Sequence, residues 1–471
     1  MNPFETSGPR RKLPVILLLL VIVVVALAAA AFTQRARLES QPPQITLSSS
    51  AEFLGIAPLD ILVSDTGAGL RSVTATIAQG GTVQTLVSEQ YAQPVAEKKF
   101  SVALAKVPGI KEGPATLRIV TRDNSLWHWG AGNEAAVEKN ITIDVTPPAI
   151  ELVADDRYVN FGGVGAIVYK ASADTATSGV TLGNDFFPGF QGVIKDHPDY
   201  FFALFAHPYN APPEARPTLV AVDKAGNSRE MRLSYELKNV RYKKSTIALS
   251  DHFMQNTVAP LLKEPAARQG SVKDVFIAVN KGMRKENEDR IRTVTSKKTP
   301  QMLWKGAFVQ LSNTKVEANF ADLRTYTYDK EPVDTAYHLG FDLAATKNYP
   351  IEAANSGVVA FAGDLGIYGN AVIIDHGLGL FSLYGHMSVI DVKVGDTVAK
   401  RQVLGKTGQT GLAAGDHLHY GVYLDGIAVL PVEWWDQKWI DDNITPKLAG
   451  RSGQEIADSQ QPHRAASKRR R

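Results

Sequence analysis

The first constraint on this chain is an apolar run near its amino end. Leu13 to Phe32 comprises 20 residues without a charged or strongly polar side chain. A helix rises ~1.5 Å per residue, so this run spans ~30 Å, the thickness of the hydrocarbon core of a bilayer. No amphipathic pattern interrupts it, which argues against a buried helix of a soluble domain. The run predicts a transmembrane helix over 13–32.

Charges on either side of the run predict its orientation. Arg10-Arg11-Lys12 precedes it, against Arg35 and Arg37 behind it. The basic excess on the short amino-terminal side predicts that this end stays in the cytoplasm. A cleaved signal peptide is the alternative, because Ala26-Leu27-Ala28 has the pattern of a cleavage site. With either reading, residues 40–471 lie outside the cytoplasm.

Charge and cysteine content exclude several classes of protein. The 471 residues hold 51 Lys and Arg, 48 Asp and Glu, and no cysteine. The net charge of +3 combines +3 over residues 1–39, +4 over 450–471 and −4 over the body between them. A weakly acidic body predicts no nucleic-acid partner. Without cysteine the chain has no disulfide scaffold, Cys-ligated zinc, iron–sulfur cluster or cysteine nucleophile.

The amino-terminal half carries an internal repeat. Three segments recur in the same order about 100 residues later, which predicts a duplicated unit: 42–47 at 147–152, 65–70 at 174–180, and 119–123 at 220–223. Apolar and polar residues alternate within each unit, and Gly80-Gly81 is typical of a two-residue hairpin turn.

This pattern predicts two β-sandwiches, over 42–146 and 147–240. The diproline borders and the Asp223–Asn227 turn resemble bacterial immunoglobulin-like domains.

The pattern then changes to a helical one. Ser271 and Asp274 form an N-cap pair, and Val272, Phe276 and Val279 follow at helical spacing. We therefore expect a helical connector over 241–304.

Histidines concentrate in the last third of the chain. His338 and Asp342 are four residues apart, a separation of ~13 Å in a straight strand. Since zinc bonds to nitrogen and oxygen are only ~2.0–2.2 Å long, both can reach one ion only if the chain bends between them. Gly340 is permissive enough for that bend.

Two further elements bring more histidines. In His417-Leu418-His419 the alternation is strand-like, so both imidazoles share a face about 6–7 Å apart. One can bind a metal ion while the other stands beside its open position. His386 ends an apolar segment that can form a neighbouring strand. Two histidines and one aspartate would leave the fourth zinc position free for water, as in catalytic sites.

Together these segments resemble the lysostaphin/LytM-type zinc metalloendopeptidases, which cut peptidoglycan peptides. The resemblance covers residues 305 to 440 and rests on these stretches: 338–342, 366–370, 375–377, 384–387, 394–396, 405–408 and 415–419. One departure lies at Phe320-Ala321-Asp322-Leu323-Arg324, where the family pattern has Phe-Gly-x-Arg.

The resemblance implies roles for five residues. His338, Asp342 and His419 would bind one Zn²⁺ per chain, and His386 and His417 would be the two remaining active-site histidines. Since no H-E-x-x-H glutamate is present, a histidine would take the proton from the attacking water.

The whole chain is therefore predicted to be mainly β, with an anchor and a carboxyl-terminal antiparallel peptidase domain. The expected parts are a cytoplasmic end 1–12, a transmembrane helix 13–32, a linker 33–41, the sandwiches 42–146 and 147–240, the connector 241–304, the peptidase domain 305–445, and a basic disordered tail 446–471.

The predicted function is zinc-dependent cleavage of peptidoglycan crosslinks or stem peptides. The enzyme would be held in the bacterial inner membrane by a single span, with its domains in the periplasm or cell-wall space. Two alternatives are a non-hydrolytic scaffold that binds the wall or activates another hydrolase, and an adhesin built on the sandwiches. No metal ligand of the family pattern is lost, which favours the enzyme over the scaffold.

Overall fold

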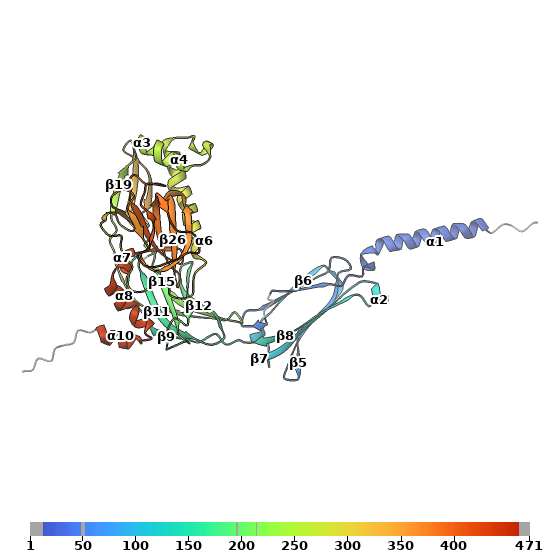
Figure 1. Ribbon diagram of the computed structural model, residues 1–471. Helices are drawn as coiled ribbons and strands as arrows, with labels where there is room; N and C mark the ends of the chain where they lie inside the picture. The colour runs from blue at the N-terminus through green and yellow to red at the C-terminus, as the bar shows by residue number, and fades with distance from the viewer. Residues whose placement is uncertain (1–12, 49–51, 195, 213, 461–471) are drawn as a thin grey trace, which may run out of the picture. The chain divides into compact units, whose positions relative to one another are not determined.

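The computed structural model describes residues 13–48, 52–194, 196–212 and 214–460 (Figure 1). The chain divides into two compact units. The first comprises residues up to Pro147 together with Val222–Asn227, and the second comprises Pro148–Ala221 and everything from Ser228 onward. The predicted cytoplasmic end 1–12 lies outside the described residues.

The amino-terminal apolar run is helical. Helix α1 covers Leu13–Thr33, and a short 3₁₀ turn, η1, follows at Arg35–Leu38. Among the helices of the described residues, none is long and apolar enough to cross a membrane. The predicted span is thus not confirmed.

Two β-sheets build the rest of the first unit. The smaller sheet has the order β1-β3-β6 and the larger the order β2-β8-β7-β4-β5. Their strands are β1 (Gln44–Leu47), β2 (Phe53–Leu54), β3 (Leu59–Ser64), β4 (Leu70–Gln79), β5 (Thr82–Val95), β6 (Glu97–Val102), β7 (Gly113–Asp123) and β8 (Glu134–Ile143). Alternate residues of both sheets share one core, including Ile61, Val73 and Ile119. The two layers agree with the predicted sandwich, while the immunoglobulin-like assignment stays a prediction.

Gly80 and Gly81 form the hairpin turn between β4 and β5, as predicted. Gln79 pairs with Thr82, and both glycines have positive φ, 56° and 82°. Such a turn follows the twist of the flanking strands and favours glycine at both positions.

The second predicted sandwich belongs to the second unit except for Val222–Asn227. It has one sheet of order β14-β15-β11-β9 and another of order β13-β12-β16-β17. The strands are β9 (Ile150–Ala154), β10 (Tyr158–Asn160), β11 (Val164–Ala171), β12 (Thr175–Leu182), β13 (Asp185–Pro188), β14 (Phe190–Gln191), β15 (Phe201–Ala206), β16 (Thr218–Asp223), β17 (Ser228–Arg232) and β18 (Glu236–Lys238). Buried residues from 154 to 456 form one continuous hydrophobic cluster, so this sandwich shares a core with the carboxyl-terminal domain.

The connector is helical over most of its length. It contains α3 (Asp251–Phe253), η3 (Met254–Val258), α4 (Ala259–Leu261), η4 (Pro265–Arg268), α5 (Val272–Ile277), η5 (Ala278–Met283) and α6 (Arg284–Thr295). The predicted capping pair is confirmed: Ser271 Oγ accepts from the Asp274 amide at 3.2 Å, and the Asp274 carboxylate accepts from the Ser271 amide at 3.3 Å.

The predicted start of the helical connector, residue 241, lies too early in the chain. Residues 244–248 form strand β19 (Lys244–Ala248), which pairs in parallel with β21 (Leu323–Tyr328). β21 in turn pairs with β22 (Glu331–Tyr337). This segment therefore belongs to a sheet of the peptidase region, because a pairing partner distant in sequence decides its structure.

A large antiparallel sheet dominates the carboxyl-terminal region, with α6 beside it (Figure 1). Its order is β20-β23-β31-β27-β26-β25-β29, and β32 (Ile427–Val429) pairs with β31. The strands are β20 (Lys315–Ala318), β23 (Phe341–Ala344), β25 (Gly357–Asp364), β26 (Asn370–Gly377), β27 (Leu380–Met387), β29 (Thr397–Val398) and β31 (Leu418–Leu424). A smaller sheet joins β24 (Pro350–Glu352), β30 (Val403–Lys406) and β28 (Val389–Ile390).

Helices follow the last strand, and the prediction of a disordered tail is therefore wrong for residues 446–460. After α7 (Pro431–Trp435) and α8 (Gln437–Asn443) come α9 (Thr445–Leu448) and α10 (Gly453–Gln460). Ile456 of α10 is buried against the common core. Residues 446–460 are therefore ordered by packing that a local charge pattern does not reveal, and 461–471 lie outside the described residues.

Buried polar contacts join the second sandwich to these helices. Glu433 of α7 accepts from Asn160 Nδ2 at 2.7 Å and from the Val164 amide at 2.9 Å. Lys447 of α9 forms an ion pair with Asp156, and both side chains are buried. Burial, opposed by these hydrogen bonds, raises the pKa of Glu433 to about 8.

This raised pKa predicts that the second unit loses stability as pH rises. Because the folded pKa of about 8 exceeds the ordinary value of 4.5, the contribution is complete below pH 4.5 and lost as pH approaches 8. Its size is several kcal/mol for a buried group. We expect Glu433→Gln to flatten this dependence, as measured by denaturant unfolding between these pH values.

Glu433→Gln should also lower the free energy of unfolding by an amount that does not depend on pH, because an amide NH₂ group cannot accept a hydrogen bond from the Val164 amide. Glu331→Gln, on an exposed strand position, is the matched control and should keep the wild-type pH dependence. If the free energy of unfolding of Glu433→Gln fell with pH as steeply as that of the wild type, Glu433 would not be the group responsible.

Candidate metal centre

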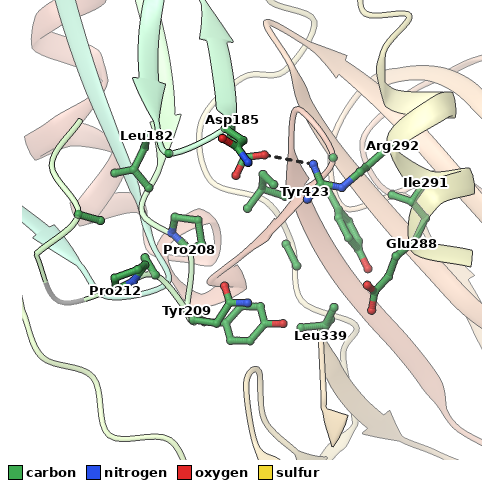
Figure 2. Close-up of a pocket in the computed structure, with 18 of the residues that line it drawn as sticks. Leu182, Asp185, Pro208, Tyr209, Pro212, Glu288, Ile291, Arg292, Leu339 and Tyr423 are labelled. Carbon is green, nitrogen blue, oxygen red and sulfur yellow. Dashed lines mark hydrogen bonds and ion pairs between the residues drawn. The ribbon is translucent and has the colours of Figure 1, made fainter. Parts of the chain in front are cut away.

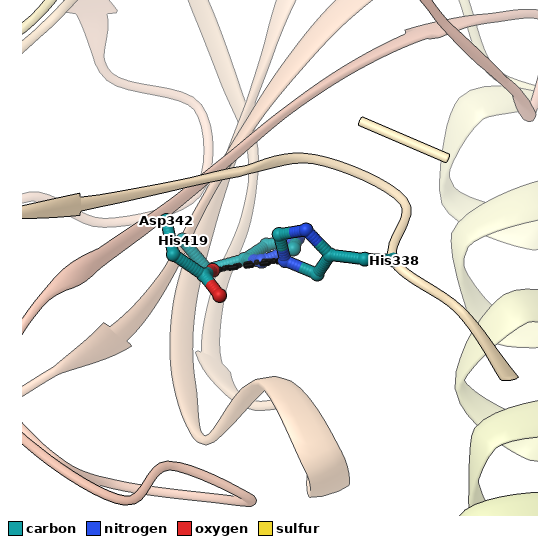
Figure 3. Close-up of side chains that lie close together, drawn as sticks. All are labelled: His338, Asp342 and His419. Carbon is teal, nitrogen blue, oxygen red and sulfur yellow. Dashed lines mark hydrogen bonds and ion pairs between the residues drawn. The ribbon is translucent and has the colours of Figure 1, made fainter. Parts of the chain in front are cut away.

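Three side chains from two strands and the loop before one of them converge in the large sheet (Figure 3). His338 follows β22, Asp342 lies in β23, and His419 lies in the adjacent strand β31. Asp342 and His419 are directly paired in register, so the sheet itself places their side chains together. The chain bends at 338–340, between the two strands, as the short His–Asp spacing requires.

The converging atoms have the spacing of zinc ligands. His338 Nε2 lies 2.9 Å from Asp342 Oδ1 and 3.0 Å from His419 Nδ1, and the latter two atoms are 3.1 Å apart. Two ligands of a tetrahedral zinc ion with bonds of ~2.0–2.1 Å are roughly 3.3 Å apart. The predicted set of two imidazole nitrogens and one carboxylate oxygen therefore fits this ion.

The proton of His338 is directed away from the centre. Its Nδ1 lies 2.9 Å from the Asn319 carbonyl oxygen. Since a carbonyl can only accept, Nδ1 carries the hydrogen and the lone pair of Nε2 faces Asp342 and His419. This arrangement prepares the imidazole for metal binding.

The packing around Gly340 leaves no room for a side chain. A Cβ atom there would lie 2.6 Å from His419 Nε2 and 2.6 Å from the Tyr420 carbonyl oxygen. The sequence predicts that Gly340 supplies backbone freedom, whereas the structure shows close approach of the two strands at this position. Position 340 therefore controls the place of the third ligand.

Arg324 positions the carboxylate ligand. Its guanidinium donates to Asp342 Oδ2 at 2.9 Å, which leaves Oδ1 for the centre. In the sequence this arginine stands only in the segment that departs from the family pattern, and no role is predicted for it. Ala321, where the family pattern has glycine, keeps a left-handed conformation with φ 57°, and its amide donates to the His338 carbonyl at 2.6 Å. The turn is thus formed despite the departure.

His386 enters the site through an irregularity of its strand. The pairing of β26 with β27 shifts between Asn370 and Val372, and His386 has φ 62°, which is unusual for a residue other than glycine. Bulges of this kind re-aim a side chain and recur next to active sites. Its Nδ1 donates to the Thr410 carbonyl oxygen at 2.7 Å, so the Nε2 lone pair is free.

His417 stands immediately before β31 and lies next to both Asp342 and His386. Its Nδ1 donates to the Gly415 carbonyl oxygen at 2.8 Å, and its Nε2 lies 3.4 Å from Asp342 Oδ1. The His417 and His386 rings have centroids 4.7 Å apart. The two histidines assigned by resemblance therefore form a pair beside His338, Asp342 and His419.

The charges of the site depend on its burial. For Asp342, burial alone would raise the pKa of the carboxyl, but the three neighbouring imidazoles, His338 first among them, hold this pKa well below its usual range. Burial, with His417 and His419 nearby, lowers the pKa of His386 to about 3. The carboxylate is thus ionised and His386 neutral at neutral pH.

The centre opens into a cavity of about 570 Å³. Beside the five site residues, the connector contributes to its wall, with Phe253 of α3, Phe276 of α5 and Arg284 of α6. The connector therefore helps to shape the space that a substrate would enter.

A second cavity of about 630 Å³ lies elsewhere in the same unit (Figure 2). It is lined by Tyr209, Glu288, Leu339 and Tyr423, and an ion pair of Arg292 with Asp185 at 3.2 Å borders it. None of the five site residues lines it, so it is separate from the metal centre.

His376 shows that burial of a histidine in this sheet does not make it a ligand. Its Nδ1 contacts the Ser356 carbonyl oxygen and its Nε2 the Ser382 hydroxyl, each at 2.7 Å. Both ring nitrogens are thus used by the protein, which gives His376 a structural role.

Comparison with known proteins agrees with this site. Residues 336–431 match Peptidase family M23. The DD-carboxypeptidase/endopeptidase Mpg of Neisseria meningitidis is 42% identical over 95 residues, which cover 20% of this chain and 22% of that protein. The peptidoglycan DD-endopeptidase ShyA of Vibrio cholerae is 34% identical over 115 residues, covering 24% and 26%.

Among solved structures, the catalytic domain of lysostaphin from Staphylococcus simulans is 25% identical, covers 28% of this chain and 98% of that domain, and has a TM-score of 0.24. The chain spans about a fifth to a quarter of the length of the two curated relatives. Its carboxyl-terminal part carries an M23 metallopeptidase domain.

Substitution of Gly340 by alanine should weaken zinc binding. The added Cβ would displace His419, and even groups that only support a ligand contribute at least ~10-fold to metal affinity. The measurement is zinc content and competition with a chelator on the purified protein. Gly415→Ala is the matched control, because a Cβ there meets nothing within 4 Å. Equal zinc affinity in the two variants would contradict the steric role.

Proposed function

We propose that this chain is a zinc-dependent endopeptidase that hydrolyses peptide bonds of peptidoglycan, in crosslinks or stem peptides. The observation that carries the proposal is the convergence of His338, Asp342 and His419, with ligand atoms 2.9–3.1 Å apart, beside a pair of further histidines. The similarity to a DD-carboxypeptidase/endopeptidase and a peptidoglycan DD-endopeptidase supports the substrate class.

Each group of the site has a defined task in such a reaction. Zinc bound by His338, Asp342 and His419 would supply a Lewis acid that polarises the peptide carbonyl and makes water more acidic. Arg324 keeps Asp342 oriented, and the Asn319 carbonyl keeps His338 in the binding tautomer.

His386 and His417 handle protons and developing charge. Because both donate Nδ1–H to backbone carbonyls, each presents Nε2 to the cavity. A neutral Nε2 can accept a proton from water, and once protonated it can donate a hydrogen bond to an oxyanion or give the proton to the leaving amine.

A non-hydrolytic scaffold is the alternative function. Such a role would not need a complete ligand set or a histidine pair with fixed tautomers. In this chain all five groups lie together, and backbone carbonyls orient three of the histidines. The arrangement supports catalysis over wall binding alone.

Replacement of either proton-handling histidine should separate metal binding from turnover. We expect His417→Ala and His386→Ala to retain zinc but to lower cleavage by at least ~10²-fold, since general acid–base groups contribute that much. Release of soluble fragments from purified peptidoglycan, with mass analysis of the muropeptides, measures the activity.

His252→Ala, at an exposed position of α3, is the matched control and should keep full activity. Cleavage by the zinc-free protein, or full turnover in both active-site variants, would contradict the proposal.

We also propose that the chain acts from the periplasmic or wall-facing side of the bacterial inner membrane, held there by residues 13–32. The support is the sequence itself, a 20-residue apolar run preceded by Arg10-Arg11-Lys12. Deletion of residues 1–32 should move the protein from the membrane fraction to the soluble fraction after alkaline extraction. Membrane retention of the deleted form would contradict an anchor at this place.

A further inference from the structure

Three carboxylates meet at the amino-terminal edge of the first unit. Glu39 follows η1, Asp65 follows β3, and Asp123 ends β7, and one oxygen of each lies within 4.8 Å of the other two. Negative charges at this spacing repel one another strongly when water is excluded.

The two aspartates are held in place by backbone amides. Asp123 is fully buried: its Oδ1 accepts from the Ser125 amide at 2.9 Å and the Asn133 amide at 2.7 Å, while Oδ2 accepts from Asn133 Nδ2 at 2.8 Å. These three hydrogen bonds fix the position of the Asp123 carboxyl group at the cluster.

Asp65 has an oxygen without a partner. Its Oδ1 accepts from the amides of Gly67 and Gly69 at 2.8 and 3.0 Å. Its Oδ2 is buried and forms no hydrogen bond, although the residue is only 7% exposed. An unpaired buried carboxylate oxygen is costly, and a bound ion is one way to satisfy it.

Glu39 completes the group from the segment behind the amino-terminal helix. One of its oxygens accepts from the Ala68 amide, and Gly67 leaves the room that its carboxylate occupies. Burial, together with the charges of Asp65 and Asp123, raises the pKa of Glu39. The cluster thus resists full ionisation when only protein groups surround it.

We propose that Glu39, Asp65 and Asp123 form a calcium-binding site. The donors are all carboxylate oxygens, which suit a hard cation, and no imidazole or thiol is present to favour zinc. Calcium accepts irregular arrangements and bidentate carboxylates, whereas magnesium requires a near-ideal octahedron. A divalent cation would take the free Oδ2 of Asp65 as a ligand and remove the repulsion among the three charges.

The site would fasten the segment after η1 to the sandwich edge. Ser125 Oγ donates to the Glu39 carbonyl at 2.6 Å, and Asn133 Nδ2 donates to the same carbonyl at 3.2 Å. The Leu126 amide and Ser125 Oγ also donate to the Arg37 carbonyl, and Asn133 Nδ2 donates to the Gln41 carbonyl. A cation shared by residues 39, 65 and 123 would add to these contacts and tighten the docking of the segment.

The test is hydrogen exchange of the full chain, zinc-loaded, at Ca²⁺ concentrations from about 10 μM to 10 mM, which bracket weak extracellular-type sites. We expect calcium to slow exchange in peptides covering 36–41 and 64–70 at least about tenfold. Magnesium at the same concentrations should have a smaller effect.

Asp65→Asn is the sharpest variant, because its side-chain oxygen still accepts from Gly67 and Gly69 while the charge is lost. Asp65→Asn should abolish the calcium effect. In chelator its exchange should be no faster than that of the wild type, because the loss of one charge lowers the repulsion within the cluster. Asp60→Asn, on the neighbouring β3 and ion-paired with Lys99, is the matched control and should keep the calcium effect.

Absence of a calcium effect in the wild type would overturn the proposal, and so would its persistence in Asp65→Asn. If that variant failed to fold, Glu39→Gln at the half-exposed position would decide between the same two outcomes. Faster exchange of Asp65→Asn in chelator, equal to that in calcium, would show a structural carboxylate and likewise overturn the site.

Discussion

The catalytic region depends on holding three acceptor atoms about 3 Å apart without a protein cation between them. His338 Nε2, Asp342 Oδ1 and His419 Nδ1 point at one another, an arrangement that mutual repulsion of lone pairs would open in a flexible chain. The large sheet resists this opening because β23 and β31 are paired in register at Asp342 and His419. The Asn319 carbonyl and Arg324 then fix which atoms of His338 and Asp342 face inward.

The large sheet is packed against the second sandwich. One hydrophobic cluster runs through both, and Glu433 and the Lys447–Asp156 pair seal the contact. Burying these groups is costly unless each finds its partner, so the two parts can separate only at the expense of several unsatisfied polar atoms. The two repeated units predicted from the sequence therefore differ in the hydrophobic core to which each contributes. The first has a core of its own, whereas the second shares the core of the peptidase domain.

Much of the fold could be predicted from local patterns. The Gly80-Gly81 turn, the Ser271–Asp274 cap and the mainly β character all depend on residues close together in sequence. The errors fall where distant partners decide. Strand β19 forms because β21 lies beside it, and α10 is ordered because Ile456 meets the common core. A pattern read along the chain contains neither partner.

For the site, the sequence by itself determined which residue types are present and in what order: His338, Asp342, His386, His417 and His419, with a bend near Gly340. Only the tertiary structure decided that Gly340 is needed for the approach of His419, that a bulge turns His386 inward, and that Arg324 orients Asp342. The physical reason is that spacing along one strand limits where a side chain can point, whereas convergence to 3 Å depends on pairing between strands far apart in the chain.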